Sequence, residues 1–567
     1  MTAPSHHSSH HRSGSAPVGP RFRPEDEVDF VVVGVGAAGG IVVRELATAG
    51  FKVVALEQGP FLHEGDFRHD ELAVSQLAAL TNDFTRSPNT YRKTDQELAK
   101  PRNMVAYGRA VGGGTIHYTG NLWRFHEIDF IERSRRGTVA GSAMADWPIT
   151  YADLEPYYTR VEWEIGVSGQ AGASPFDPPR SKPYPLPPIP IKSTGVLLER
   201  GAKQLGWTAF PAPMGILSKP YRGRGACVSC GFCETFGCEV QAKSSTLVSM
   251  IPDAIATGRC EIRPLSYVRK IETDAGGRVT GVKYFDSANR EIFQRAKAVV
   301  VCANGAETPR LLLMSASKQF PNGLANSSGM VGRHLMFNGG GVAVGLFDHE
   351  VNGYKGAVVS RVVHDLYELD PKLGLYGGGG FDFRWDMNPI GFALGGLPPE
   401  APNWGPEYKQ MLRDYFNRTV LSFAHTTSLP VETNTITLDP TLKDSWGLPA
   451  IRVTHREHPS DMNLYRYFMD RAHDLLTAAG ATRRWAFPFS DMPGTQNPHL
   501  LGTCRMGSDP KRSVVNRFHR AHDVPNLFVV DGSSFVTSGR GQPTMTIMAL
   551  AFRAGEAIAA MAKRGEI

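Results

Sequence analysis

Three glycines near the start of the chain have the spacing of a phosphate-binding turn. Gly34, Gly36 and Gly39 form the pattern Gly-x-Gly-x-x-Gly directly after an apolar, β-branched run at residues 28–34. In such a turn the first glycine permits the bend, the second lets backbone approach a pyrophosphate, and the third lets a helix pack closely on a strand. Free N–H groups at the helix start attract the phosphates. The pattern predicts a dinucleotide site that Ala37 and Ala38 help to form.

The residues after this turn support the same interpretation. Residues 34–50 have helical spacing, and residues 51–56 form a second buried, strand-like run that leads to Glu57, 18 residues after Gly39. A carboxylate at that place accepts hydrogen bonds from the adenosine ribose hydroxyls. A glycine-rich turn in another kind of α/β protein is the alternative. The motif alone does not distinguish FAD from NAD.

Four of the seven cysteines lie within 12 residues, at Cys227, Cys230, Cys233 and Cys238. Thiolates from one short loop can converge on a soft metal, as in zinc and iron–sulfur sites. Seven is an odd number for a disulfide framework. A metal or iron–sulfur site is one interpretation of this cluster, and a reduced or partly disulfide-bonded structural loop is the other.

Other segments indicate the elements that must position these residues. Short buried strands are predicted at residues 298–302 and 527–530, and an amphipathic helix at 459–479. A final helix is predicted from Thr544 to Lys563, with Pro543 at its first turn. We therefore expect an α/β fold with a Rossmann-type dinucleotide-binding domain. A second domain, for substrate, should combine an antiparallel sheet with helices. We also expect a helical patch at residues 72–80, strands at 419–428 and 435–438, and a proline-rich connector at 173–192.

Composition excludes several classes of function. A chain of 567 residues with 41% hydrophobic and 20% charged residues is typical of a soluble protein with two or three structural units. The net charge of +6 is not gathered into a dense basic run, which disfavours nucleic-acid binding. No apolar run reaches about 18 residues, so no transmembrane segment is expected. Residues 1–25 lack the apolar core of a secretory signal and predict a disordered tail.

Several further segments complete a family pattern. They are a second glycine-rich loop at residues 108–118, Asn-Gly-Ala-Glu-Thr-Pro at 304–309, His-Leu-Leu-Gly-Thr-Cys-Arg-Met-Gly at 499–507, Asp-Gly-Ser at 531–533, and Gln-Pro-Thr-Met-Thr at 542–546. In order and spacing they resemble the glucose–methanol–choline (GMC) flavoprotein oxidoreductases. The resemblance spans residues 27–565 and is weak across 345–485, where family members differ because that part faces the substrate.

The resemblance implies FAD as the cofactor and assigns further residues to it. In the family the second glycine loop lies against the pyrophosphate and flavin, the Asp-Gly pair contacts ribityl and flavin, and the last helix points its N-terminus at the flavin. On this chain the implied residues are Arg109, Gly112, Gly113, Thr115, His117, Tyr118, Asp531, Gly532 and Thr544, with Val268 as a backbone contact to adenine. Pyranose and choline oxidases attach FAD covalently through a histidine at the place of His117. Other relatives have a histidine nearby that forms no covalent bond to FAD.

The resemblance also implies the chemistry. A family histidine beside the flavin takes the hydroxyl proton while hydride passes to flavin N5, and His499 stands at its place. Imidazole suits this task because its ordinary pKa lies near 6.5. The family's second active-site residue is histidine or asparagine, where this chain has Gln542. Glutamine can donate a hydrogen bond but cannot act as a base. We expect His499 to remove the proton and Gln542 to orient the alkoxide.

The cysteines and residues 121–125 favour the branch of gluconate 2-dehydrogenase and glycoside 3-dehydrogenase large subunits. In some of these the cysteines hold a [3Fe-4S] cluster that relays electrons to a cytochrome c subunit. We expect a dehydrogenase acting on a secondary alcohol of a sugar, sugar acid or glycoside. It could have a small partner subunit and be cytoplasmic, or periplasmic if exported with that partner. An oxygen-using oxidase, an FAD-containing lyase and a non-catalytic electron-transfer subunit are the alternatives.

These assignments define the expected domains. Residues 26–150, 215–344 and 491–567 should form a discontinuous FAD-binding domain. Residues 151–214 and 345–490 should form the substrate-binding domain.

Overall fold

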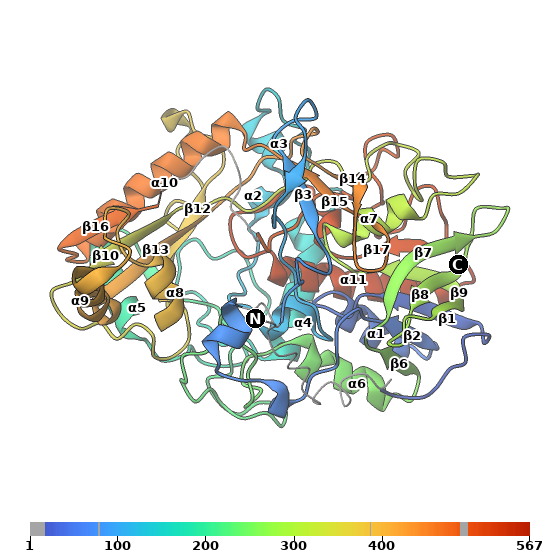
Figure 1. Cartoon of the computed structure of the whole chain (residues 1–567), viewed down its shortest axis with the longest axis horizontal. Coiled ribbons are helices and arrows are strands. Elements are labelled where there is room, and N and C mark those ends of the chain that lie inside the picture. The colour runs from blue at the N-terminus through green and yellow to red at the C-terminus, as the bar shows by residue number, and fades with distance from the viewer. Residues whose placement is uncertain (1–17, 77–79, 386, 488–496) are drawn as a thin grey trace, which may run out of the picture.

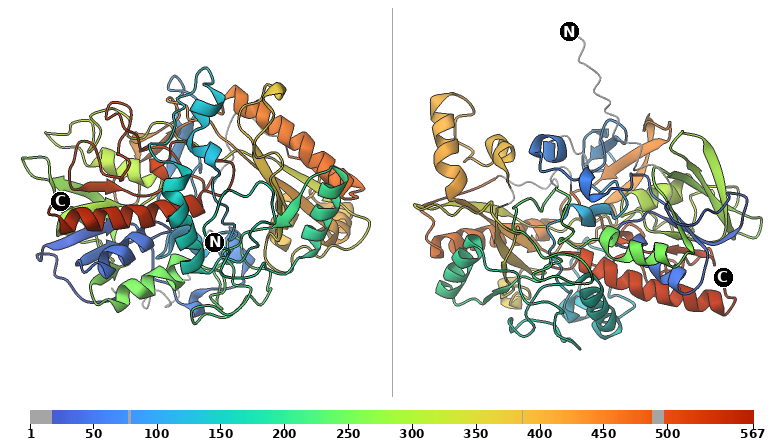
Figure 2. Two further views of the ribbon diagram at one scale, coloured as in Figure 1. Left: turned by 180° about the vertical axis from the view of Figure 1, so that it is seen from behind. Right: turned by 90° about the horizontal axis from the view of Figure 1, so that it is seen from below.

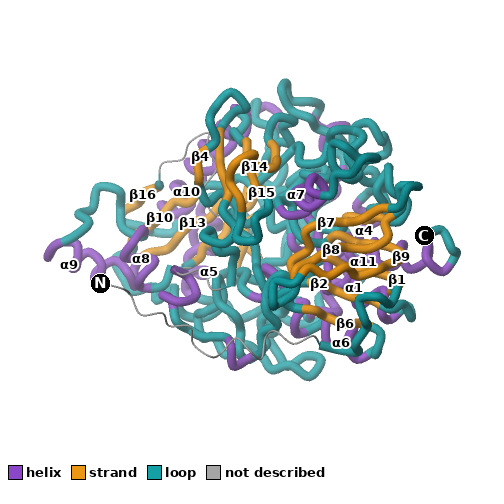
Figure 3. Tube along the Cα trace, turned by 45° about the vertical axis from the view of Figure 1, so that its right-hand side comes forward, coloured by secondary structure: helices purple, strands orange, loops and turns teal. Residues whose placement is uncertain are grey.

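The computed structural model describes residues 18–76, 80–385, 387–487 and 497–567. Within these residues three sheets carry the architecture (Figure 1). A seven-stranded sheet lies on the right of Figure 1 and a six-stranded sheet on the left, and a small four-stranded sheet lies between them. Figure 3 shows the same strands from an oblique direction, with long loops filling the space between the sheets.

The seven-stranded sheet is the Rossmann-type core. Its order is β6-β2-β1-β9-β8-β7, and β17 also pairs with β9. The central pairs, β1–β2 and β1–β9, are parallel, whereas β7, β8 and β9 form an antiparallel extension. The strands are β1 (Val28–Val33), β2 (Val53–Leu56), β6 (Cys260–Arg263), β7 (Tyr267–Thr273), β8 (Val279–Phe285), β9 (Glu291–Val301) and β17 (Leu527–Val529). β-Branched residues fill the buried central strands, as parallel sheets require. The strands predicted near residues 28, 51, 298 and 527 are confirmed.

Helices cover this sheet. The long C-terminal helix packs against the first helix and against a helix from residues 151–165, and Figure 2 shows it crossing the back of the molecule. The helices of this half are α1 (Gly39–Thr48), α4 (Tyr151–Ile165), α6 (Met250–Ala256), α7 (Glu307–Met314) and α11 (Thr544–Lys563). Among the described residues, α11 is the one helix long and apolar enough to cross a membrane. Most of it is buried in the core of this domain.

The six-stranded sheet is antiparallel and forms the second domain. Its order is β16-β10-β13-β12-β11-β5. The strands are β5 (Ala209–Pro211), β10 (Val342–Leu346), β11 (Arg361–Val363), β12 (Gly379–Arg384), β13 (Thr419–Thr426) and β16 (Arg483–Ala486). Helices α5 (Ser193–Gln204) and α10 (Pro459–Ala478) pack on one face, where Phe381, Phe383 and Phe468 are buried. The predicted helix at 459–479 and strand at 419–428 are confirmed.

A four-stranded sheet joins distant parts of the chain. It contains β3 (Asn89–Arg92), β4 (Lys100–Pro101), β14 (Thr435–Lys443) and β15 (Pro449–Thr454). Shorter helices complete the fold: α2 (Glu127–Phe130), α3 (Glu132–Arg136), α8 (Pro389–Gly395) and α9 (Gly405–Tyr415). Residues 435–454 were expected in the substrate domain. The structure instead packs β14 on α7 of the FAD-binding domain, because Ile436, Ile451 and Val453 share a buried cluster with Ala306.

Three further boundaries differ from the sequence expectations. Residues 151–165 belong with the FAD-binding domain, because the apolar face of α4, including Leu154 and Val161, packs on α11. The predicted tail ends earlier than residue 25: Val18 pairs with Ile262, and the backbone N–H of Phe22 donates to Glu261. Residues 1–17 lie outside the described residues. The helical patch expected at 72–80 is a single π-helical turn, Leu72–Gln76, and residues 77–79 are outside the description.

Candidate active site

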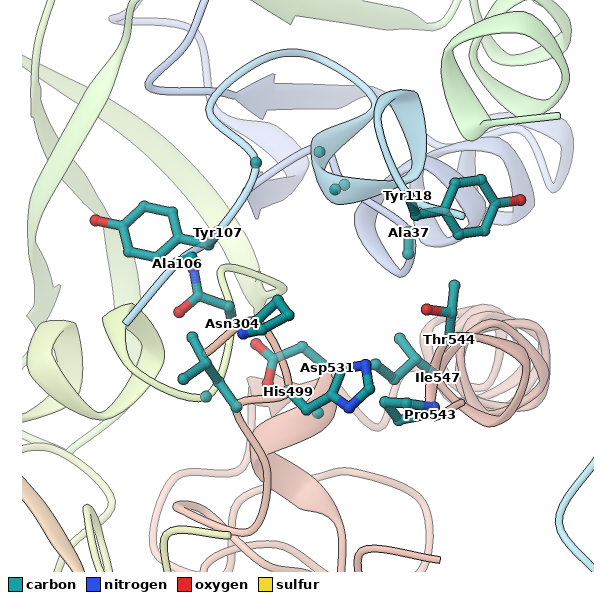
Figure 4. Close-up of a pocket in the computed structure, with 18 of the residues that line it drawn as sticks. Ala37, Ala106, Tyr107, Tyr118, Asn304, His499, Asp531, Pro543, Thr544 and Ile547 are labelled. Atoms are coloured by element: carbon teal, nitrogen blue, oxygen red, sulfur yellow. The ribbon is translucent and has the colours of Figure 1, made fainter. Parts of the chain in front are cut away.

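A cavity of about 820 Å³ lies between the two large sheets. Figure 4 shows His499, Asp531, Pro543 and Thr544 along one side, with Ala37 and Tyr118 across from them. Many of the sequence-predicted site residues line it: Gly34, Gly36, Ala37, Ala38, Glu57, Gly113, Thr115, His117, Tyr118, Val268, His499, Asp531, Gly532, Gln542 and Thr544. Gly39, Arg109 and Gly112 do not line it. Gly39 is the first residue of α1, and Arg109 and Gly112 belong to the second glycine-rich loop.

The two glycine loops form a backbone cradle at the ends of the parallel strands. Gly34 has a φ of 88°, and a Cβ there would lie 2.6 Å from the carbonyl oxygen of Cys302. A Cβ on Gly39 would overlap the carbonyl oxygen of Gly34, so only glycine lets α1 pack this closely on the turn. Open αβ sheets bind ligands beyond the carboxyl ends of their strands. The cradle therefore fits the pyrophosphate of a dinucleotide such as FAD.

Acidic side chains follow two of these strands. Glu57 accepts hydrogen bonds from the backbone N–H groups of Val35 (3.0 Å) and Gly59 (2.9 Å), which fixes its carboxylate at the cavity wall. Burial raises the pKa of Glu57 to about 7. Asp531, after β17, accepts from the backbone of Ser533 (2.8 Å) and from the hydroxyl of Thr308 (2.6 Å). Both acids are thus held rigidly where hydroxyl groups of a bound dinucleotide can reach them.

The N-terminus of α11 opens onto the cavity. Pro543, Thr544 and Ile547 line it, and the first N–H groups of the helix have no partner within the helix. The positive end of the helix dipole therefore faces the cavity and favours negative charge there. This geometry fits the part of a flavin that gains negative charge on reduction.

His499 is held against the cavity by its own backbone. Its N–H donates to the side-chain oxygen of Asn497 (3.1 Å), and the imidazole lines the cavity. Burial, with smaller effects from His425 and Arg384, lowers the pKa of His499 to about 3. The imidazole is therefore neutral, and a neutral ring has a nitrogen that can accept a hydrogen bond.

Gln542 belongs to a buried polar cluster that sequence analysis missed. Its side-chain nitrogen lies 3.1 Å from Nδ1 of His425, and Nε2 of His425 lies 2.9 Å from Asp382. Arg384 donates its Nε–H to Asp382 at 2.6 Å. Only His425, Arg384 and Gln542 of this cluster line the cavity directly. No sequence motif marks His425 or Asp382. Asp382 lies in β12 and His425 in β13, and in each strand the residue two positions away faces the same side of the sheet.

His117 and Tyr118 extend from the second glycine loop toward the cysteine segment. Burial, and to a smaller extent Lys243, lowers the pKa of His117 to about 4, and no described residue hydrogen-bonds its Nε2. Its environment thus keeps the imidazole neutral with one nitrogen available. Covalent attachment of FAD at His117 stays a prediction, and acid precipitation distinguishes the outcomes: a yellow supernatant means a non-covalent flavin.

The cysteine segment is tied to that loop by a buried lysine. The ammonium group of Lys243 donates to the carbonyl oxygens of Tyr118 (3.1 Å), Phe236 (2.7 Å) and Cys233. Burial raises the pKa of the Cys233 thiol to about 12. Within the described part of the chain, no three His, Cys, Asp or Glu side chains are grouped to hold a metal ion. As folded, the four cysteines therefore do not fit the predicted cluster site.

Comparisons with known proteins agree with this geometry. The N-terminal sequence model of the family described as GMC oxidoreductase matches residues 28–349, and its C-terminal model matches residues 430–551. The 2-methyl-1,2-propanediol dehydrogenase of Mycolicibacterium austroafricanum is 37% identical, over 94% of this chain and 95% of its own. The gluconate 2-dehydrogenase flavoprotein of Pantoea cypripedii is 30% identical, over 94% of this chain and 93% of its own.

Solved structures share the fold. A formate oxidase from Aspergillus oryzae RIB40 aligns with a TM-score of 0.66 at 16% identity, covering 96% of this chain and 100% of its own. The predicted α/β fold, the FAD cofactor and the class of enzyme are thereby confirmed: the protein is an FAD-dependent oxidoreductase acting on alcohols or sugars. With a backbone cradle for the dinucleotide, a helix N-terminus at the cavity and matching sequence models over most of its length, this chain belongs to the GMC oxidoreductase family.

Proposed function

We propose that the protein is a dehydrogenase that oxidises a secondary alcohol of a sugar, sugar acid or glycoside, with His499 as the base. The observation that carries this proposal is the neutral imidazole of His499 in the same cavity as the N-terminus of α11 and Gln542. Bound FAD supplies the hydride acceptor, at flavin N5. His499 takes the hydroxyl proton, and Gln542 holds the substrate beside it.

The residues around the cavity keep His499 in the deprotonated form that a base requires. Burial lowers the pKa of both His499 and His425, and His425 lowers the pKa of His499 further. One proton leaves the substrate in each turnover, and the neutral ring of His499 has a nitrogen free for it, although burial disfavours the imidazolium that forms. The dipole of α11 stabilises negative charge at the part of the cavity that Pro543 and Thr544 line.

Names of relatives favour this class and extend the substrate panel. A fructose dehydrogenase large subunit from Gluconobacter japonicus is 29% identical, and a paromamine 6'-oxidase from Streptomyces fradiae is 30% identical. The 2-methyl-1,2-propanediol dehydrogenase adds small diols to the compounds that should be tested as substrates. Because the fructose dehydrogenase relative is named a large subunit, a small partner and a cytochrome c acceptor stay part of the proposal.

An anaerobic titration of the purified holoenzyme tests the proposal. Sugars, sugar acids, glycosides and small diols are added in turn, and the visible absorption of the flavin is followed. Bleaching by a polyhydroxylated substrate supports it. Intact flavin with every compound refutes it and favours a lyase. Iron measured on the same sample tests the [3Fe-4S] prediction, and peroxide formed in air distinguishes an oxidase from a dehydrogenase.

A further inference from the structure

We infer that Asp382 and Glu234 are specificity-determining residues that exclude anionic substrates, because together they take up the positive charge of Arg384 at the cavity wall. A sugar acid is then rejected, and the substrate carries no carboxylate. This inference rests on the proposed function and removes one of the substrate classes that the proposed function includes.

The charged side chains that line the cavity are mostly acidic. Among the described residues Arg384 is the one lysine or arginine there, whereas four acidic side chains line it: Glu57, Glu234, Glu307 and Asp531. Three histidines also line it: His117, His425 and His499. Burial lowers the pKa of all three, which disfavours a positive charge on any of these rings. Within the described part of the cavity wall, a substrate carboxylate could therefore form an ion pair only with Arg384.

The guanidinium of Arg384 is already surrounded. Its Nε donates to one carboxylate oxygen of Asp382 at 2.6 Å, and its Nη2 donates to the other. The remaining nitrogen, Nη1, lies 4.0 Å from a carboxylate oxygen of Glu234. The guanidinium carbon also lies 4.2 Å from the centre of the Phe423 ring. The Arg384 side chain is only 3% exposed, so little of it is left for a substrate carboxylate.

Asp382 holds Arg384 in this position as a carboxylate. The two residues lie two apart on β12, so their side chains share a face of the sheet. Burial alone would raise the pKa of Asp382, but the charge and the hydrogen bonds of Arg384 hold it below its usual value. The pair is therefore ionised. Releasing Arg384 to a substrate would leave the fully buried Asp382 without its counter-charge, which is costly.

Glu234 reaches the cavity from the cysteine segment. The backbone on either side of it is fixed, because Lys243 donates to the carbonyl oxygen of Cys233 and the N–H of Thr235 donates to that of His117 at 2.8 Å. The Glu234 side chain lines the cavity and is 33% exposed. A substrate carboxylate that approached Nη1 of Arg384 would therefore meet the like charge of Glu234 beside it.

These contacts distinguish uncharged from anionic substrates. An uncharged sugar can bind through hydrogen bonds and leave both carboxylates on Arg384. A sugar acid must either bind its carboxylate without a cation or displace Asp382 or Glu234 from Arg384. Each course leaves one negative charge without a partner, which costs more than one neutral hydrogen bond left unmade. The N-terminus of α11 also favours negative charge, but that part of the cavity fits the reduced flavin.

Matched acids and amides test the inference on the unmodified holoenzyme. D-Glucuronate and D-glucuronamide have the same hydroxyl groups and differ by one negative charge at pH 7, as do D-gluconate and D-gluconamide. The first readout is the apparent second-order rate constant of flavin reduction in anaerobic stopped flow. The second is the dissociation constant of each compound from the oxidised holoenzyme, measured by isothermal titration calorimetry. We expect each amide to exceed its acid by about tenfold or more in rate constant or in affinity.

Two variants test the residues that exclude the acid. Glu234→Gln and Asp382→Asn each remove one negative charge beside Arg384 with little change of shape. In both, the advantage of the amide over the acid should fall to about threefold or less, because Arg384 is then left with charge for a carboxylate. A merely structural role would lower both compounds together and keep their ratio. The exposed pairs Glu432–Arg333 and Asp348–His349 give the matched controls Glu432→Gln and Asp348→Asn, which should also keep the ratio.

The outcomes separate this inference from the proposed function. If acids reduce the flavin as well as their amides do, the function stands and the inference is wrong. A ratio that stays at tenfold in both Glu234→Gln and Asp382→Asn also contradicts it. If no sugar, glycoside, diol or amide reduces the flavin, the proposed function fails, and the dissociation constants alone decide the inference. Amides that bind no better than their acids then overturn it. Flavin content shows whether each variant is folded, and the unmodified protein decides the matter if a variant is not.

Discussion

A Cβ atom on Gly113 would lie 2.7 Å from the Cα of Gly36, so the two glycine-rich loops meet through their backbones. Gly113 also has a φ of 56°, in the left-handed region that side chains disfavour. These loops are far apart in the sequence, yet both line the cavity. Their contact explains why the second loop needs glycine at residue 113.

Gly113→Ala should therefore weaken FAD binding. The added methyl group must push the loops apart, and the left-handed backbone costs about 1–2 kcal/mol for any other residue. We expect FAD affinity to fall by about tenfold or more, as measured by flavin fluorescence on titrating the apoprotein. Gly65→Ala is the matched control, because a Cβ there meets no atom within 4 Å. Unchanged affinity in Gly113→Ala would show that the loop contact does not shape the cofactor site.

His499→Ala should lower the rate of flavin reduction by about a hundredfold or more, because general base catalysis contributes that much. Stopped-flow absorbance under anaerobic conditions measures this rate at saturating substrate. His349→Ala, on an exposed loop, should leave it unchanged. If His499→Ala keeps the full rate with normal flavin content, His499 does not accept the substrate proton.

The rate of flavin reduction should stay constant between pH 8 and pH 5. Burial, with His425 and Arg384, lowers the pKa of His499 to about 3, so the neutral form needed for a base is present above that pH. At pH 5 only about 1% of His499 would be protonated, whereas a histidine of ordinary pKa would be almost fully protonated. We expect a flat rate from pH 8 to pH 5. A decline of about thirtyfold with a midpoint near 6.5 would assign the base to a solvent-exposed group.

Local patterns in the sequence predicted many of the residues that line the cavity on the side of the glycine-rich loops. Gly34, Gly36 and Gly39 act through the turn that they themselves form, and Glu57 follows the next strand, so their spacing alone fixes their positions. Thr544 was predictable in the same way, because Pro543 marks the start of its helix.

The substrate half depends on pairing between distant strands. His425 reaches Asp382 because β12 and β13 pair in one register, and a shift by one residue would place the two side chains on opposite faces of the sheet. No short-range signal in either strand specifies this register. α4 was misassigned for a related reason: its apolar stripe can pack on any apolar helix, and only the tertiary structure shows that α11 is the partner.

The segment that carries Gln542 is anchored by a buried ion-pair network. Arg540 is fully buried and pairs with Asp129 at 2.5 Å and with Glu132, and the hydroxyl of Tyr367 donates to Asp129 at 2.6 Å. Replacing the guanidinium would leave two buried carboxylates without a counter-charge. Such a loss costs much more than an exposed pair, because the carboxylates cannot recover their hydration.

Arg540→Met should therefore lower the free energy of unfolding by about 3–5 kcal/mol, as measured by urea denaturation of the FAD-saturated protein. Arg564→Met is the control, since Arg564 pairs with Glu566 at the surface, where water replaces the lost partner. The first variant should also reduce flavin more slowly, because Gln542 lies two residues from Arg540 and depends on the same backbone. If both variants unfold at the same urea concentration as the parent, the carboxylates Asp129 and Glu132 must be protonated in the native protein, and the network would not be ionic.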